Sequence, residues 1–124
     1  MAIVGTHMLL YTTEPEALRA VFRDVFKFRH VDAGDGWLIF ALPPAELGIH
    51  PAEGPMFESG MRHSISFMCD DIKATIRDLR AKGIKVEGEP QDEGWGITTM
   101  LHLPGGAQVM LYEARHPVAI EAKA

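Results

Sequence analysis

The side chains of this 124-residue chain that could carry chemistry are six histidines, one cysteine and the carboxylates beside them. The clearest arrangement lies at residues 45–50, which read as a strand. Strand alternation puts Glu46 and His50 on one face and Leu47 and Ile49 on the other. If the apolar pair packs against helices, the carboxylate and the imidazole face a cavity. Such a pair could bind a divalent metal ion or move a proton.

The other reactive side chains have simpler interpretations. We expect His30, His102 and His116 on the surface or at a rim, with His102 closest to a predicted turn. Cys69 falls on the apolar face of its strand, which predicts a packing role. A catalytic thiol would need a basic neighbour, and the sequence identifies none for it.

Composition limits the class of protein. The chain has the length and apolar content of one globular domain, residues 1–124. Its net charge of −5, without a basic patch, argues against nucleic acid or a membrane surface as the partner. The lone Cys69 excludes an internal disulfide and fits a reducing compartment. No apolar run reaches the roughly 20 residues of a membrane span, so we expect a cytoplasmic protein.

The first half, residues 5–52, predicts a strand, a helix and three more strands. The helix begins at Thr13, Glu14 and Pro15, with Thr13 as the expected cap. The expected strands cover residues 6–12, 29–32, 37–42 and 45–50.

The same order then repeats. Residues 53–62 read as a linker rich in Gly, Pro, Glu and Ser, residues 63–114 as a second module, and residues 115–124 as a tail. In the second module Asp70 and Asp71 are expected to cap the helix. The expected strands cover residues 64–69, 84–86, 97–103 and 108–113. Because a module of this size cannot close a core alone, the two must pack together.

Three stretches of this pattern resemble a known family. They read HMLLYTTEPEALRAVFRDVFKF, SISFMCDDIKATIRDLRAKGIKV and LPGGAQVMLYE. Their order and spacing are similar to the vicinal oxygen chelate superfamily, which includes glyoxalase I, bleomycin-resistance proteins, fosfomycin-resistance enzymes and extradiol dioxygenases. The resemblance implies an α+β fold of two tandem βαβββ modules, with a curled mixed sheet around a cavity and helices on the outer face. It also implies a homodimer.

The resemblance further implies a metal site with one ligand on the first and last strand of each module. His7 matches the first position, although it could equally be a half-buried strand residue. Glu46 or His50 matches the second, and the sequence does not choose between them. Ser64 and Met110 fall where the other two ligands belong. A hydroxyl and a thioether are poor neutral ligands for Zn, Ni, Mn or Fe. We therefore expect that the protein binds no metal cofactor, and a bound divalent ion is the alternative.

Alternation also predicts which side chains face the cavity. They are mainly Met, Tyr and Leu with a few polar groups, a mixture that suits an apolar or aromatic ligand. In the alternative interpretation the same side chains only fill the space between the modules. The set comprises Leu9, Tyr11, Ser66, Met68, Gln108, Met110 and Tyr112, together with His7 and Ser64.

Two functions follow from these features. The first is metal-free binding or sequestration of a small, largely apolar molecule, as in the bleomycin-resistance proteins. The second is a divalent-metal-dependent lyase, isomerase or dioxygenase that acts on a substrate with vicinal oxygens. The first requires no stoichiometric metal, whereas the second requires tight metal binding that depends on His7.

Overall fold

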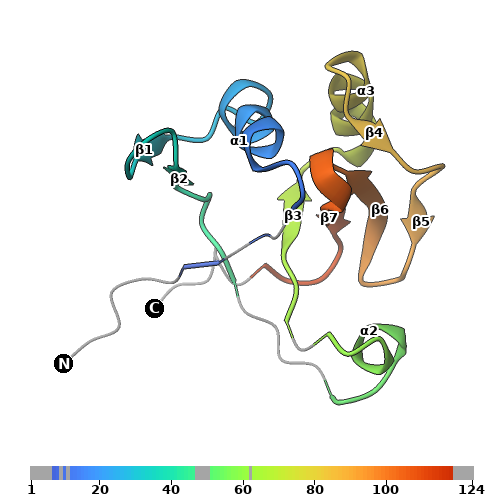
Figure 1. The fold of residues 1–124 in the computed structure, drawn as a ribbon. Coiled ribbons are helices and arrows are strands. Elements are labelled where there is room, and N and C mark those ends of the chain that lie inside the picture. Colours follow the sequence, from blue (N-terminus) through green and yellow to red (C-terminus); the bar gives the residue numbers. More distant parts are fainter. Residues whose placement is uncertain (1–6, 9, 11, 47–50, 62, 119–124) are drawn as a thin grey trace.

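A mixed five-stranded sheet organises the computed structural model, which describes residues 7–8, 10, 12–46, 51–61 and 63–118 (Figure 1). A separate two-stranded hairpin lies beside helix α1. The architecture is therefore α+β with a mixed sheet, as the sequence predicts. Within the described residues no helix has the length and apolar content needed to cross a bilayer.

The second half of the chain supplies the whole five-stranded sheet. Its elements are β3 (Ser66–Cys69), α3 (Ile72–Ala81), β4 (Lys85–Val86), β5 (Gln91–Asp92), β6 (Gly96–His102) and β7 (Gln108–Ala114). The strand order is β3-β7-β6-β4, and β5 also pairs with β6. Strands β3 and β7 are parallel, and the remaining pairs are antiparallel. This is the predicted strand–helix–strands order, with β5 as an additional short strand in a stretch expected to be all turn.

The first half differs more from expectation. It contains α1 (Pro15–Asp24) and a hairpin of β1 (His30–Asp32) and β2 (Leu38–Phe40). The described residues of the expected strands 6–12 and 45–50 are in no strand, and residues 9, 11 and 47–50 lie outside the described part. The expected linker contains a short helix, α2 (Pro55–Glu58), which Pro55 begins at a position where the missing N–H costs nothing.

The two long helices begin in different ways. Asp71 caps α3, and its carboxylate accepts a hydrogen bond from the Ala74 amide at 3.1 Å, as predicted. Helix α1 has Glu14 at its N-cap, with no side-chain cap bond. The expectation that Thr13 caps α1 is therefore wrong. The Thr13 hydroxyl donates instead to the Gly105 carbonyl at 3.3 Å.

Both long helices pack on one face of the sheet. Apolar residues recur along each helix at helical spacing, which gives each one a single buried stripe. Odd-numbered side chains of β6 and β7 meet these stripes. The buried core comprises Leu18 and Phe22 from α1, Ile72, Ile76 and Leu79 from α3, and Leu101, Val109 and Leu111 from the sheet.

An aromatic cluster joins the two halves of the chain. The ring of Phe22 lies 5.1 to 6.0 Å, centroid to centroid, from those of Phe26, Phe28, Phe40 and Phe67. Most of these pairs are edge-to-face, the favoured geometry for aromatic rings. Since Phe40 lies on β2 and Phe67 on β3, the cluster holds the hairpin and α1 against the main sheet.

A second junction lies at the turn between β6 and β7. The Thr12 hydroxyl donates to the Pro104 carbonyl at 2.7 Å and accepts from the Glu14 amide at 3.1 Å. The Thr13 amide donates to the Gly105 carbonyl at 3.2 Å. Gly105 has φ +77°, and a Cβ there would lie 2.6 Å from the Glu14 nitrogen and 2.8 Å from the Thr13 nitrogen. The entry to α1 therefore needs a residue without a side chain at this turn.

We predict that Gly105→Ala lowers the free energy of unfolding by about 3 kcal/mol, because steric overlap with the α1 entry adds to the strain of a left-handed backbone. Urea unfolding monitored by circular dichroism measures this loss. Gly106→Ala is the matched control, since Gly106 has φ +82° but open space around its Cβ position. Its expected cost is only about 1 kcal/mol. Equal costs for the two variants would contradict the steric argument.

Candidate functional site

The face of the sheet opposite α1 and α3 presents a row of methionines. The register pairs Met110 with Ser66 on one side and with Met100 on the other, and it pairs Tyr112 with Met68 and Thr98. Side chains on directly paired residues share one face of a sheet. We call this surface the methionine face. It comprises Ser66, Met68, Thr98, Met100, His102, Gln108, Met110 and Tyr112.

The structure thus brings together those predicted cavity residues that lie on β3 and β7, namely Ser66, Met68, Gln108, Met110 and Tyr112. The other predicted residues are placed differently. Ser64 is exposed just before β3, and His7 is exposed and in no strand. Leu9, Tyr11 and His50 lie outside the described residues.

Tyr112 lies at one end of this face in a polar and aromatic cluster. It is 9% exposed, and its ring stands at 72° to that of Trp95 with the centroids 5.4 Å apart. The Nδ1 atom of His116 lies 2.8 Å from the Pro117 carbonyl oxygen, which can only accept, so Nδ1 carries the hydrogen. The Nε2 atom of the same ring lies 3.3 Å from the Tyr112 hydroxyl, within hydrogen-bond distance. The Glu46 carboxylate lies 3.8 Å from the same Nε2 atom.

This environment favours the protonated phenol. Burial raises the pKa of Tyr112 above its ordinary value of 10.0, and the negative charge of Glu46 raises it further. Tyr112 is therefore a hydrogen-bond donor at neutral pH. Glu46, expected from its sequence position to face a cavity, lies beside His116.

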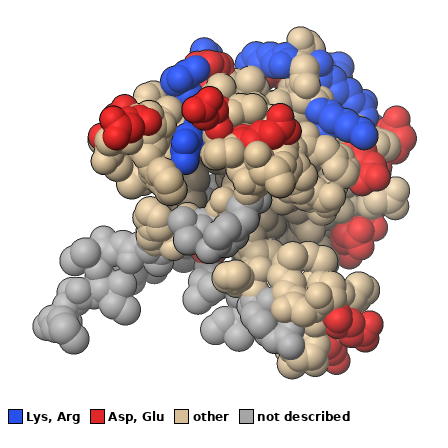
Figure 2. Space-filling model, in the orientation of Figure 1, with Lys and Arg blue, Asp and Glu red and all other residues tan. Residues whose placement is uncertain are grey.

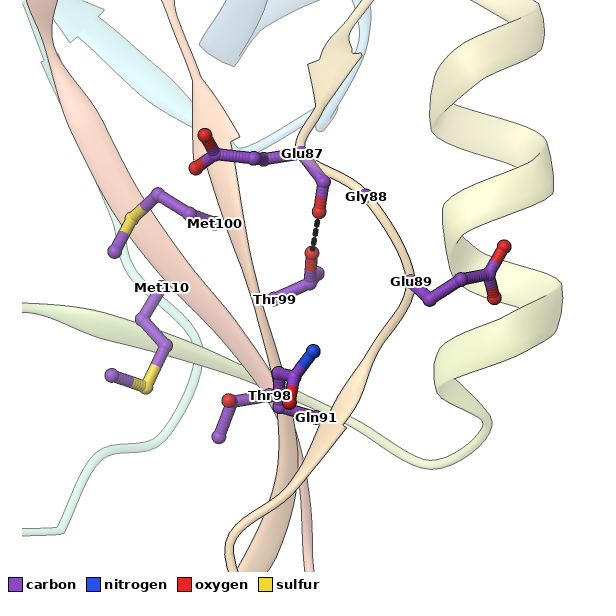
Figure 3. Close-up of a pocket in the computed structure, with 8 residues that line it drawn as sticks. All are labelled: Glu87, Gly88, Glu89, Gln91, Thr98, Thr99, Met100 and Met110. Atoms are coloured by element: carbon purple, nitrogen blue, oxygen red, sulfur yellow. Dashed lines mark hydrogen bonds between the residues drawn. The ribbon is translucent and has the colours of Figure 1, made fainter.

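An open groove of about 350 Å³ runs along the β6 part of the face, beside Thr98 and Met100, under the segment that joins β4 to β5 (Figure 3). The Glu87 and His102 side chains meet there, with Oε2 and Nε2 3.2 Å apart. The Thr99 hydroxyl fixes the segment by donating to the Glu87 carbonyl at 3.0 Å. The groove is lined by Glu87, Gly88, Glu89, Gln91, Thr98, Thr99, Met100 and Met110.

The opposite face of β7 and β3 carries side chains with structural partners. The Glu113 carboxylate accepts a hydrogen bond from the Ile72 amide at 3.0 Å and so stabilises the start of α3. Glu113 thus lies on the face away from Met110, as alternation predicts. Cys69 packs against the core, and burial raises the pKa of its thiol, which agrees with the predicted packing role.

The described residues do not assemble a metal site. Within that part of the chain, no three His, Cys, Asp or Glu side chains lie close enough to hold an ion. Glu46 lies beside His116, while His7 is exposed. Met110 offers a thioether on the methionine face, and Ser64 offers an exposed hydroxyl. Such donors do not suit the borderline and hard ions that His and carboxylates bind.

Comparison with known proteins identifies the family. The model of the Glyoxalase/Bleomycin resistance protein/Dioxygenase superfamily matches residues 6–111. The chain belongs to this superfamily. The match extends through both halves of the chain and confirms the resemblance read from the three sequence stretches.

Solved structures share the fold. TnmS3, an antibiotic binding protein from Streptomyces sp. CB03234, aligns with a TM-score of 0.64 and 21% identity over 92% of this chain and 98% of that one. A superfamily member from Sphaerobacter thermophilus DSM 20745 gives a TM-score of 0.58 and 22% identity over 91% and 98%. A lactoylglutathione lyase from Agrobacterium tumefaciens gives a TM-score of 0.61 and 19% identity over 90% of this chain and 95% of that one. No curated protein sequence matches the chain significantly. At these identities the likeness establishes the fold and leaves the function open.

The sequence did not predict the contribution of β6 to the methionine face, namely Thr98, Met100 and His102. It also did not predict three neighbours of the face, Glu87, Trp95 and His116. Glu87 precedes a turn-rich stretch, so its side chain had no predicted face. Trp95 and His116 lie beyond the ends of predicted strands, where alternation gives no direction. One sequence pattern could have indicated the role of Glu87, because segment 87–93 holds four carboxylates and no basic residue.

We predict that Tyr112 ionises above the ordinary tyrosine range. The chain has two tyrosines, so Tyr11→Phe isolates Tyr112 in an ultraviolet titration. Adding Glu46→Gln lowers its pKa part of the way, because burial is the larger cause of the rise. The free energy of unfolding falls as the pH rises from about 10.0 through the folded-state value, since the unfolded chain releases this proton first. Ionisation at or below the ordinary value would contradict the assignment.

Proposed function

We propose that the protein binds and sequesters a small, largely apolar molecule on the methionine face, without a metal ion. The observation that carries this proposal is the composition of the face. Its centre is made of thioethers from Met68, Met100 and Met110, which lie on adjacent, paired strands. Thioethers are polarisable and adapt to flat or irregular apolar ligands.

The polar groups around this centre support the same function. Thr98 and Tyr112 bring hydroxyls to the face, and Ser66 and Gln108 are exposed near its edge. A mainly apolar surface with a few directed polar groups is typical of small-molecule sites. TnmS3, a structural neighbour, is an antibiotic binding protein, which is consistent with this class of function.

The donor set is the reason to prefer binding over metal-dependent catalysis. In the alternative, a lyase, isomerase or dioxygenase would need ligands at the positions of Ser64 and Met110, and neither side chain is a good one. The described part of the chain also holds no cluster of three ligating side chains. The lyase among the structural neighbours shares the fold at 19% identity.

We further propose a cytoplasmic homodimer, as the family resemblance implies. The hairpin supports a second copy as partner, because Val31 and Ile39 are directly paired and both exposed, and Trp37 lies beside them. Exposed apolar patches of this kind mark interaction sites. Light scattering of the purified protein tests the state, and a monomer at all concentrations would contradict it.

Binding can be measured with 9-anthracenemethanol, a flat neutral probe whose absorption overlaps tryptophan emission. We predict saturable energy transfer from Trp95, which is 46% exposed and contacts Tyr112. Trp95→Phe removes most of the transfer. Trp37→Phe is the matched control, since Trp37 lies on the hairpin next to the Arg19 guanidinium and keeps most of the transfer. No saturable binding, or equal losses in the two variants, would contradict the proposed site.

Elemental analysis tests the metal-free part of the proposal. Untagged protein dialysed against Zn, Mn, Fe(II) and Ni is expected to retain no stoichiometric ion. About one ion per chain, lost on His7→Ala, would favour the metal-dependent enzyme instead.

A further inference from the structure

A threonine hydroxyl opens onto the groove beside β6. Thr98 is only 8% exposed, lines the groove and makes no side-chain hydrogen bond within the described part of the chain. Figure 3 shows its side chain on the same side of β6 as those of Met100 and Met110. No fully buried side-chain oxygen or nitrogen among the described residues lacks a partner, so this hydroxyl is open to the groove and can bond with whatever fills it.

A carboxylate lies over the same surface. Glu87 projects beside Met100, whereas Glu89 on the same segment points away from the methionines (Figure 3). One oxygen of Glu87 contacts His102, and the side chain remains 68% exposed. Because an ionised carboxylate has about four lone-pair sites, Glu87 can accept further hydrogen bonds beside that one.

The wider surroundings of the groove are also negative. Segment 87–93 holds four carboxylates and no basic residue. Within the described part of the chain, two cations contact the segment from outside: Arg115 is paired with Asp92, and the Arg80 guanidinium donates to the Gly88 carbonyl at 3.1 Å, so the excess charge is that of the remaining carboxylates. Figure 2 shows Lys and Arg intermixed with Asp and Glu at the top of the view, while acidic side chains extend down the β5 side, where no Lys or Arg among the described residues is seen in the lower part of the view. An anionic ligand would meet like charge here, and a cation would be attracted.

We propose that the groove selects organic cations that carry a flat apolar body. The ammonium group lies against the Glu87 carboxylate, the apolar body covers Met100 and Met110, and the Thr98 hydroxyl bonds to a polar atom of the ligand. This inference names the ligand class of the proposed binding function and rests on it.

The dimensions agree with such a ligand. From the contact of Glu87 with His102 to Thr98, the methionine face extends four residues along β6, or about 13 Å, and the groove lies within this length. That length accommodates a ring system of about three fused rings with an aminomethyl group at one end. The groove of about 350 Å³ lies at the small end of the range for ligand pockets, which excludes a large ligand from full enclosure.

Three matched probes test the charge preference, namely 9-(aminomethyl)anthracene, 9-anthracenemethanol and 9-anthracenecarboxylate. They share one ring system and are cationic, neutral and anionic at neutral pH. We expect the amine to bind about fivefold more tightly than the alcohol, the gain of one exposed ion pair, and the carboxylate to bind most weakly. Added salt weakens binding of the amine and leaves that of the alcohol unchanged.

Two variants test whether Glu87 supplies the negative charge that the amine contacts. Glu87→Gln is expected to remove the roughly fivefold advantage of the amine while binding of the alcohol stays within about twofold. Glu89→Gln is the matched control and changes the advantage little, since that carboxylate points away from the methionines. Circular dichroism confirms that each variant folds.

The outcomes separate the two proposals. Saturable binding of the alcohol with no preference for the amine, or equal effects of Glu87→Gln and Glu89→Gln, would overturn the cation inference and leave the binding function standing. Failure of all three probes to bind would overturn both.

Discussion

The contact between the entry to α1 and the β6–β7 turn is the constraint on which the arrangement of the two halves depends. Helix α1 has no side-chain cap of its own, and the backbone just before it is held by the carbonyls of Pro104 and Gly105. That contact fixes the direction in which α1 leaves the turn. Leu18 and Phe22 then reach the core formed by α3 and the sheet, and the phenylalanine cluster brings the hairpin with them. The close contact between the backbone before α1 and the β6–β7 turn thus determines which surface of the sheet the first half covers.

Because both helices cover one face of the sheet, strand alternation divides the side chains of each strand into a set that faces the helices and a set on the opposite face. On β7, Val109 and Leu111 supply the core and Glu113 supports the start of α3, while Met110 and Tyr112 face the other way. The side chains that face the helices pack or form hydrogen bonds within the protein. The other set includes Thr98, whose hydroxyl makes no side-chain hydrogen bond in the described part of the chain, and side chains that are only partly covered. We therefore expect ligand binding on the opposite face, since the side chains that face the helices stabilise the fold.

The sequence predicted the second half well because its signals are local. Alternation along β3 and β7 and the Asp71 cap each depend on a few consecutive residues, and the structure agrees with them. The cap of α1 was mispredicted because its partner, Gly105, is distant in sequence and no local pattern indicates it. Trp95 and His116 were not predicted as neighbours of Tyr112 for the same reason, since turns brought them together. The roles of His7, Glu46 and His50 at a metal site and of Ser64 at the ligand cavity stay predictions.

The strand order also bears on how the chain assembles during synthesis. Strand β7 is the last strand to be made, yet it lies between β3 and β6. Until it has left the ribosome, β3 has no partner among the described strands, and within this sheet only the antiparallel pairs of β6 with β4 and β5 can form. The parallel β3–β7 pair closes a long loop that contains α3, which makes it a slow contact to form. A nascent chain interrupted before residue 108 would thus expose the apolar faces of β3 and α3 together, a surface that chaperones recognise.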